Sequence, residues 1–91
     1  MSTVSTTDPG FRVAVGASVA TLRRLADYEL PPALDARLRD LAERKDLLSA
    51  VEHSELLTLV EFAQHRTIEK LDAKAALVKL HRALPDLVID P

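Results

Sequence analysis

The 91-residue chain has no cysteine, only two glycines, and no aromatic residues beyond one tyrosine and two phenylalanines. Without cysteine, the chain can form neither a disulfide scaffold nor a cysteine-ligated zinc or iron–sulfur site. The two glycines, Gly10 and Gly16, are isolated and match no glycine-rich loop that could hold a phosphate. The scarcity of aromatic side chains also argues against a stacking platform for single-stranded nucleic acid.

Basic and acidic residues are nearly balanced, with 12 lysines and arginines against 14 aspartates and glutamates. The resulting net charge of −2 provides no overall attraction to nucleic acid or to anionic lipid. The longest uncharged run, Val13–Leu22, has ten residues, which is about half the length that a membrane-spanning helix needs. We therefore expect a cytoplasmic protein without a membrane partner, and we do not favour nucleic acid as its partner.

From Ala33 to Leu84 the chain contains neither glycine nor proline, and leucine, valine and alanine supply most of its hydrophobic 47%. This composition favours long helices over strands. We predict an all-α fold, in which a short helix is followed by a helical hairpin with a long C-terminal helix. The predicted division is a mobile N-terminal tail over residues 1–17, a helical domain over residues 18–84 and a C-terminal tail over residues 85–91.

The start of the first helix is predicted from its capping residue. Ser18 is a plausible N-cap for a helix that ends near Tyr28, because Pro31 and Pro32 cannot continue it. The preceding segment, Phe11–Val15, is rich in β-branched residues and is predicted to be a strand or simply extended.

The second and third helices are predicted from a proline and from a capping box. Pro32 suits the first turn of a second helix that runs to about Lys45. Ser49 and Glu52 have the S-x-x-E spacing in which the two side chains cap each other's backbone amides. A third helix is therefore predicted to start there and to run for roughly 35 residues, until Pro85 ends it.

The long predicted helix has two hydrophobic faces. At 100° per residue, the first apolar face contains Leu57, Val60, Ile68, Leu71 and Val78, and the second apolar face contains Leu59, Phe62, Leu77, Leu80 and Leu84. One face is enough to pack against the preceding helix, so the other face needs a further cover. We expect a second copy of the chain in a homodimer, or a larger protein partner, to supply it; a compact three-helix monomer is the alternative.

Candidate catalytic and metal-binding residues are few. His65 lies four residues from both Glu61 and Glu69, which makes a metal-binding, ferritin-like helical oligomer one alternative hypothesis. Such sites use a Glu-x-x-His motif, however, and this motif does not occur in the sequence. No cysteine is available as a nucleophile, and the serines lie in the tail or at helix starts. We therefore predict a protein that is not an enzyme and that uses no cofactor.

Two short motifs resemble a known group of proteins. Leu30–Leu41 reads L-P-P-x-L-x-x-R-L-x-x-L, and Leu48–Leu56 reads L-S-x-x-E-x-x-E-L. The motifs resemble those of small uncharacterised bacterial helical proteins, whose genes often lie beside a nuclease-like gene. The resemblance covers roughly residues 28–80. It implies an antitoxin-like or accessory protein, with a nuclease-like protein as a candidate partner and no catalytic residues.

The first motif is also similar to ribbon–helix–helix antitoxins, in which a strand precedes two helices and a dimeric ribbon enters the major groove of DNA. A DNA-binding antitoxin or autorepressor is therefore an alternative function. Against this alternative, Leu22–Tyr28 is predicted as helix and contains Arg23 and Arg24 in place of an alternating pattern. We predict instead a non-enzymatic protein–protein interaction module that acts through the apolar faces of the long helix.

Overall fold

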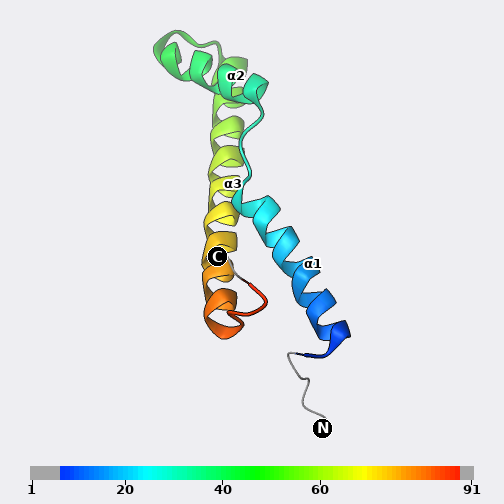
Figure 1. The fold of residues 1–91 in the computed structure, drawn as a ribbon. Coiled ribbons are helices and arrows are strands. Elements are labelled where there is room, and N and C mark those ends of the chain that lie inside the picture. Colours follow the sequence, from blue (N-terminus) through cyan, green and yellow to red (C-terminus); the bar gives the residue numbers. More distant parts are fainter. Residues whose placement is uncertain (1–6, 89–91) are drawn as a thin grey trace. The chain divides into compact units, whose positions relative to one another are not determined.

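The computed structural model describes residues 7–88, and these residues form three α-helices, one short 3-10 helix and no strand. The elements are α1 (Pro9–Ala26), α2 (Pro32–Glu43), η1 (Lys45–Leu47) and α3 (Ala50–Ala83) (Figure 1). The predicted all-α fold is confirmed, because two shorter helices precede a C-terminal helix of 34 residues. The outer parts of the two predicted tails, residues 1–6 and 89–91, lie outside the described residues.

α1 begins at Pro9 and its N-cap is Asp8, ten residues before the predicted N-cap Ser18. The side chain of Asp8 caps the helix by accepting a hydrogen bond from the backbone amide of Phe11 at 3.0 Å. Proline suits the first helical position, because that position needs no backbone N–H donor. The predicted cap is wrong, because the Ser18 hydroxyl donates to a backbone carbonyl one turn earlier at 2.9 Å. The predicted extended segment Phe11–Val15 is wrong for the same reason and lies within the helix.

α1 ends at Ala26, and the backbone amide of Asp27 donates to carbonyls of the last turn. The following helix starts at Pro32, in agreement with the predicted role of this proline. Asp35 lies in the first turn of α2, where a carboxylate interacts favourably with the positive end of the helix dipole. The short segment between α1 and α2 therefore ends at a proline and an acidic first turn, which are features that the sequence alone reveals.

The predicted capping box is present at the start of α3. The backbone amide of Ser49 donates to Oε1 of Glu52 at 3.3 Å, and the backbone amide of Glu52 donates to Oγ of Ser49 at 3.2 Å. Before this cap, the chain makes a tight turn in which the amide of Leu47 donates to the carbonyl of Arg44 at 2.7 Å. The connection between α2 and α3 is thus hydrogen-bonded at both of its ends.

The chain forms two compact units. One unit combines the chain up to Asp27 with the chain from Glu69 onward, so that it contains α1 and the C-terminal part of α3. The other unit is Tyr28–Ile68 and contains α2, η1 and the N-terminal part of α3. The first is termed the terminal unit and the second the hairpin unit.

The terminal unit has a small aliphatic core. Its buried residues come from α1, α3 and the chain after α3, and they are Val15, Val19, Ala26, Ala73, Leu77 and Val88. Half-buried hydrophobic side chains surround this core: Phe11, Leu22, Leu25, Leu80, Leu84 and Leu87. Because α1 is longer than predicted, it supplies enough apolar surface to cover part of α3.

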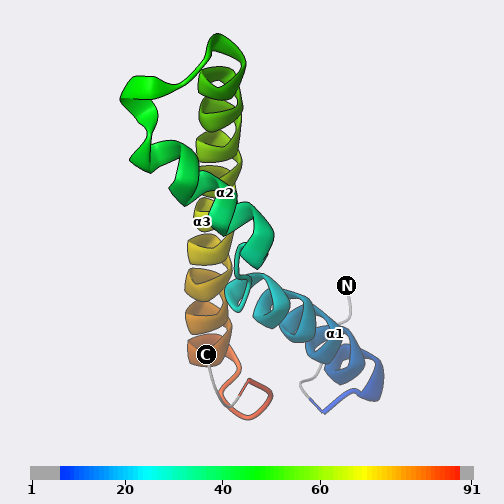
Figure 2. The same ribbon diagram turned by 90° about the horizontal axis from the view of Figure 1, so that it is seen from above.

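The chain after α3 folds back onto the terminal unit (Figures 1 and 2). The backbone amides of Leu87 and Val88 both donate to the carbonyl of Leu84 at 3.0 Å, which forms a turn. Nδ1 of His81 donates a hydrogen bond to the carbonyl oxygen of Val88, which can only accept one. The side chain of Val88 is fully buried as a result.

The hairpin unit is held by apolar and polar contacts. Leu41 of α2 is fully buried and Leu56 of α3 is buried. The guanidinium carbon of Arg66 lies 4.0 Å from the centre of the Tyr28 ring, which is a cation–π contact. This contact holds the segment before α2 against the middle of α3, within the same unit.

Candidate interaction surface

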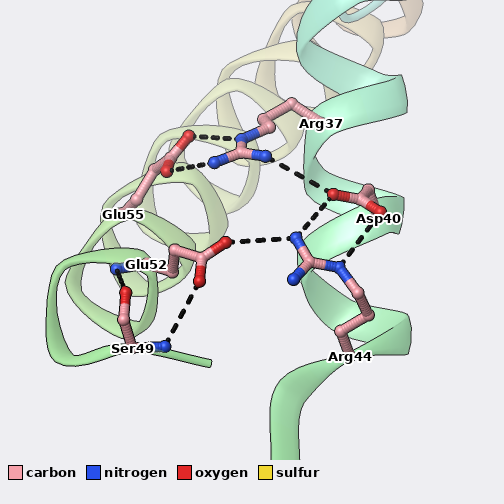
Figure 3. A network of polar contacts seen from close by, with 6 residues as sticks. All are labelled: Arg37, Asp40, Arg44, Ser49, Glu52 and Glu55. Carbon is pink, nitrogen blue, oxygen red and sulfur yellow. Dashed lines mark hydrogen bonds and ion pairs between the residues drawn. The ribbon is translucent and has the colours of Figure 1, made fainter. Parts of the chain in front are cut away.

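Five charged side chains link α2 to the start of α3 (Figure 3). Arg37 donates to both carboxylate oxygens of Glu55, from Nε at 2.7 Å and from Nη2 at 2.8 Å. Arg44 donates from Nη2 to Asp40 at 2.8 Å and to Glu52 at 3.1 Å. Asp40 also accepts from Arg37 at 3.4 Å, so it joins the two arginines into one ion-pair network. The paired Arg–carboxylate geometry links α2 to the start of α3 in this unit.

The network keeps its carboxylates ionised. A hydrogen bond from Arg37 lowers the pKa of Glu55 below its ordinary value of 4.5. The backbone amide of Ser49 and a hydrogen bond from Arg44 likewise lower the pKa of Glu52. A general acid or base needs a pKa near the working pH, whereas these shifts move the carboxylates further from neutrality. The arrangement therefore suits an electrostatic clamp between two helices.

The first apolar face of α3 is open to solvent in both units. In the hairpin unit, Leu57 and Ile68 are 57% and 59% exposed, and Val60 between them is half-buried. In the terminal unit, Leu71 and Val78 are 58% and 37% exposed. Large aliphatic side chains with such exposure leave apolar area in water that no part of residues 7–88 covers.

The second apolar face is mostly buried or half-buried. Leu77 is buried in the core of the terminal unit, and Leu80 and Leu84 pack against that core. In the hairpin unit, Leu59 is half-buried, whereas Phe62 remains 43% exposed. The two predicted faces are therefore not equivalent, because the chain covers much of the second face itself and leaves the first face exposed.

Two shallow hollows adjoin these helices. One lies in the hairpin unit, has a volume of about 390 Å³ and is lined by Ala63, Gln64, Thr67 and Ile68. The other lies in the terminal unit, has a volume of about 410 Å³ and is lined by Leu22, Leu25, Glu69, Asp72, Ala73 and Ala76. The hollow in the hairpin unit includes Ile68, so it belongs to the first apolar face.

The two alternative functions find little support among residues 7–88. A DNA-binding ribbon requires a strand before two helices, and the segment before α2 contains α1 instead. In the same residues, no group of three or more histidine, aspartate or glutamate side chains lies close enough together to hold a metal ion. The ferritin-like alternative therefore has no candidate ligand set within the described chain.

Some exposed hydrophobic residues were not singled out from the sequence. Leu47 and Val51 flank the start of α3 and are strongly exposed, as is Val13 on α1. The ion-pair network was also missed, although its signal is visible in the sequence. Arg37 and Arg44 are seven residues apart and share one side of α2. Their carboxylate partners on α3 could have been recognised only with the register of the hairpin.

Comparisons of the chain with protein-family models, with curated proteins and with solved structures found no match. Among the helices of residues 7–88, none combines the length and the hydrophobicity that crossing a membrane requires. The feature of the molecule that bears on its function is therefore the exposed apolar surface of α3.

Proposed function

We propose that this protein is a non-enzymatic interaction module that binds another protein chain through the first apolar face of α3. The observation that carries the proposal is the exposure of Leu57 and Ile68, which are more than half exposed on a regular helix. Full burial of a leucine or isoleucine side chain contributes about 1.5–3 kcal/mol relative to leaving it in water. A chain that covers this face would therefore gain substantial binding free energy.

The helix that presents this face is held in a defined position within the hairpin unit. Arg37 and Arg44 of α2 bind carboxylates of α3 on the side where the capping box also lies. Because the first apolar face is part of the same helix, the backbone that presents it needs little further ordering on binding. Such preorganisation reduces the entropy cost that association must overcome.

The biological role that we propose is that of an antitoxin-like or accessory subunit. The support for it is the resemblance of Leu30–Leu41 and Leu48–Leu56 to small bacterial helical proteins encoded beside nuclease-like genes. A larger nuclease-like protein and a second copy of this chain are the two classes of partner that fit the proposal. The exposed aliphatic face suits either, because apolar anchors dominate the centre of protein interfaces.

Site-specific photo-crosslinking in the host cell tests the proposal. Leu57 is replaced by p-benzoylphenylalanine in the full chain, and Val51 is replaced in a matched control. Val51 is even more exposed than Leu57 and lies on the same helix, but it is outside the first apolar face. Irradiation is expected to produce a discrete covalent adduct from position 57 and little or none from position 51.

The mass of the adduct identifies the class of partner, since the chain itself has a mass of 10.0 kDa. Both variants are checked for unchanged helical content by circular dichroism before irradiation. An equal yield from the two positions, or no adduct from position 57, would show that the face has no specific protein partner.

A further inference from the structure

We infer that the hairpin unit binds a second copy of itself, with the two α3 helices antiparallel over residues 57–68. The inference rests on the proposed function and names its partner. Leu57, Glu61, Gln64 and Ile68 are spaced by four, three and four residues, which places them along one side of the helix. The order four, three, four is the same when it is read from either end of the segment. Two copies of this side of the helix can therefore face each other across a two-fold axis.

The two-fold axis fixes which residues meet. If the axis lies level with the midpoint between Leu57 and Ile68, each Leu57 lies opposite the partner's Ile68. Both side chains are more than half exposed in the single chain. The dimer contains this contact twice, so it removes four exposed aliphatic side chains from water. In the same arrangement, each Glu61 lies opposite the partner's Gln64.

The hollow of the hairpin unit provides a place for an opposing side chain. It is formed by Ala63, Gln64, Thr67 and Ile68, and it lies one to two turns after Val60 on the same side of the helix. The antiparallel two-fold brings the partner's Val60 level with this hollow, and the symmetric contact fills the second hollow in the same way. A side chain that enters a space between four residues of the facing helix is the usual packing unit of paired helices.

Charge selects the antiparallel orientation. In a parallel, in-register pair, Glu61 would meet the partner's Glu61 and place two carboxylates together at the contact, which costs binding free energy. In the antiparallel pair, the Glu61 carboxylate instead meets a Gln64 side chain, whose amide can donate a hydrogen bond to it. No pair of like charges is opposed along Leu57–Ile68, because Glu61 is the only acidic residue there and Arg66 lies against Tyr28.

The contact is short. Two helical segments of this length bury less than about 1,200 Å² in total, which is the range of weak and reversible complexes. The dimer is therefore expected to form in the micromolar range of concentration and to exchange readily. A reversible dimer also leaves the same face available when the concentration of the chain is low.

Disulfide trapping tests the arrangement. Because the chain contains no cysteine, only the introduced cysteines can form a crosslink. Two variants of the full chain are made, Leu57→Cys and Ile68→Cys, and are oxidised separately and as a mixture. Antiparallel pairing places Leu57 opposite the partner's Ile68, but it separates two Leu57 positions by about 16 Å along the axis, at 1.5 Å per residue. A disulfide forms only when the two Cα atoms lie within about 7 Å.

The expected result is a crosslinked dimer from the mixture, at a yield about tenfold above that of either variant alone. Self-crosslinking of Leu57→Cys at the same yield as the mixture would overturn the antiparallel arrangement. Sedimentation equilibrium of the unmodified chain provides an independent measurement. The mean mass is expected to rise with concentration from 10.0 kDa towards twice that value.

A substitution on the first apolar face tests whether the dimer forms through this face. Ile68→Glu introduces a charge at both symmetric contacts and is expected to raise the dimer Kd by about tenfold or more. Val51→Glu changes a valine that is more exposed than Ile68 but lies outside the face, and it is expected to leave the Kd within about twofold. Because both side chains are exposed, unchanged circular dichroism is expected for both variants.

Failure of this inference differs from failure of the proposed function. A chain that stays at 10.0 kDa at millimolar concentration, and yields no mixed disulfide, is not the partner of itself. If position 57 nevertheless crosslinks to a heavier protein in the cell, the face binds a different chain and the proposed function holds. If position 57 gives no adduct either, both are overturned.

Discussion

Ser49 and Glu52 cap each other's backbone amides at the start of α3, at distances of 3.2 and 3.3 Å. Glu52 has a second role, because its other carboxylate oxygen accepts a hydrogen bond from Arg44 at 3.1 Å. Figure 3 shows that the cap of α3 and the ion-pair network meet at this one carboxylate. The start of the long helix is thereby coupled to the position of α2.

Loss of the Ser49 hydroxyl is expected to destabilise the start of α3. Ser49→Ala removes the acceptor for the Glu52 amide and should lower the free energy of unfolding by about 1 kcal/mol, as removal of an N-cap side chain usually does. Chemical denaturation followed by circular dichroism measures this change.

Ser18→Ala is a matched control for the cap. The hydroxyl of Ser18 bonds to a carbonyl within α1 and caps no amide, so its loss should change the free energy of unfolding by less than about 0.5 kcal/mol. Equal effects of the two substitutions would contradict a capping role for Ser49.

The ion-pair network is expected to make the hairpin unit sensitive to acid. In the folded chain, arginine partners lower the pKa of Asp40 and of Glu55 relative to their unfolded values. The stabilisation is therefore fully present above the ordinary carboxylate pKa, and it is lost as the pH falls through the lowered values. As the pH falls below the ordinary carboxylate pKa, the melting temperature should fall by more than repulsion among the remaining positive charges alone would cause.

Arg37→Gln distinguishes the loss of the ion-pair network from repulsion among the remaining positive charges. It removes the bidentate partner of Glu55, so the pKa of Glu55 should return towards 4.5 and the acid-induced fall in melting temperature should become smaller. Arg39→Gln removes the same charge, but Arg39 pairs with Asp35 inside α2 and does not reach α3. A pH profile for Arg37→Gln that matches the profile for Arg39→Gln would argue against the network as the source.

Local signals predicted much of the fold. Pro32 and the Ser49–Glu52 pair placed the starts of α2 and α3 correctly, because each acts within one turn of its own helix. The start of α1 was missed because Asp8-Pro9 is both a turn sequence and a good helix start. The helix that follows is stabilised by packing Val15 and Val19 into a core, which residue spacing near Ser18 does not reveal.

The candidate surface was only partly predictable for a related reason. The spacing of apolar residues on α3 predicted two faces, and it contained no information on which face the chain would cover. α1 and Val88 cover Leu77 in the structure, whereas Leu57 and Ile68 remain exposed. That choice depends on contacts between segments that are far apart in the sequence.

Gly16 offers a way to stabilise α1. It lies inside the helix without a positive φ, and a Cβ added there would meet no atom within 4 Å beyond its chain neighbours and the backbone of its own helix turns. Gly16→Ala should therefore raise the free energy of unfolding by about 0.5–1 kcal/mol, because alanine loses less backbone entropy on folding. Urea denaturation measures the gain.

Gly10→Ala is the control for this substitution. At this position the added Cβ would lie 3.2 Å from Oδ1 of Asp8, which is the capping oxygen of α1. The gain in free energy should be smaller or absent, since the cap must shift to accept the methyl group. A gain at Gly10 that equals the gain at Gly16 would mean that the Asp8 cap contributes little.

The buried end of the described chain is expected to be important for the terminal unit. Val88 is 0% exposed and packs with core residues of α1 and α3, although it follows the last helix. Val88→Ala removes two buried methyl groups and should lower the free energy of unfolding by about 2 kcal/mol. Val13→Ala makes the same chemical change at a side chain that is 73% exposed, so its effect should stay within about 0.5 kcal/mol. If the two substitutions cost the same in urea denaturation, the chain after α3 does not contribute to the core, and the second apolar face must be covered in another way.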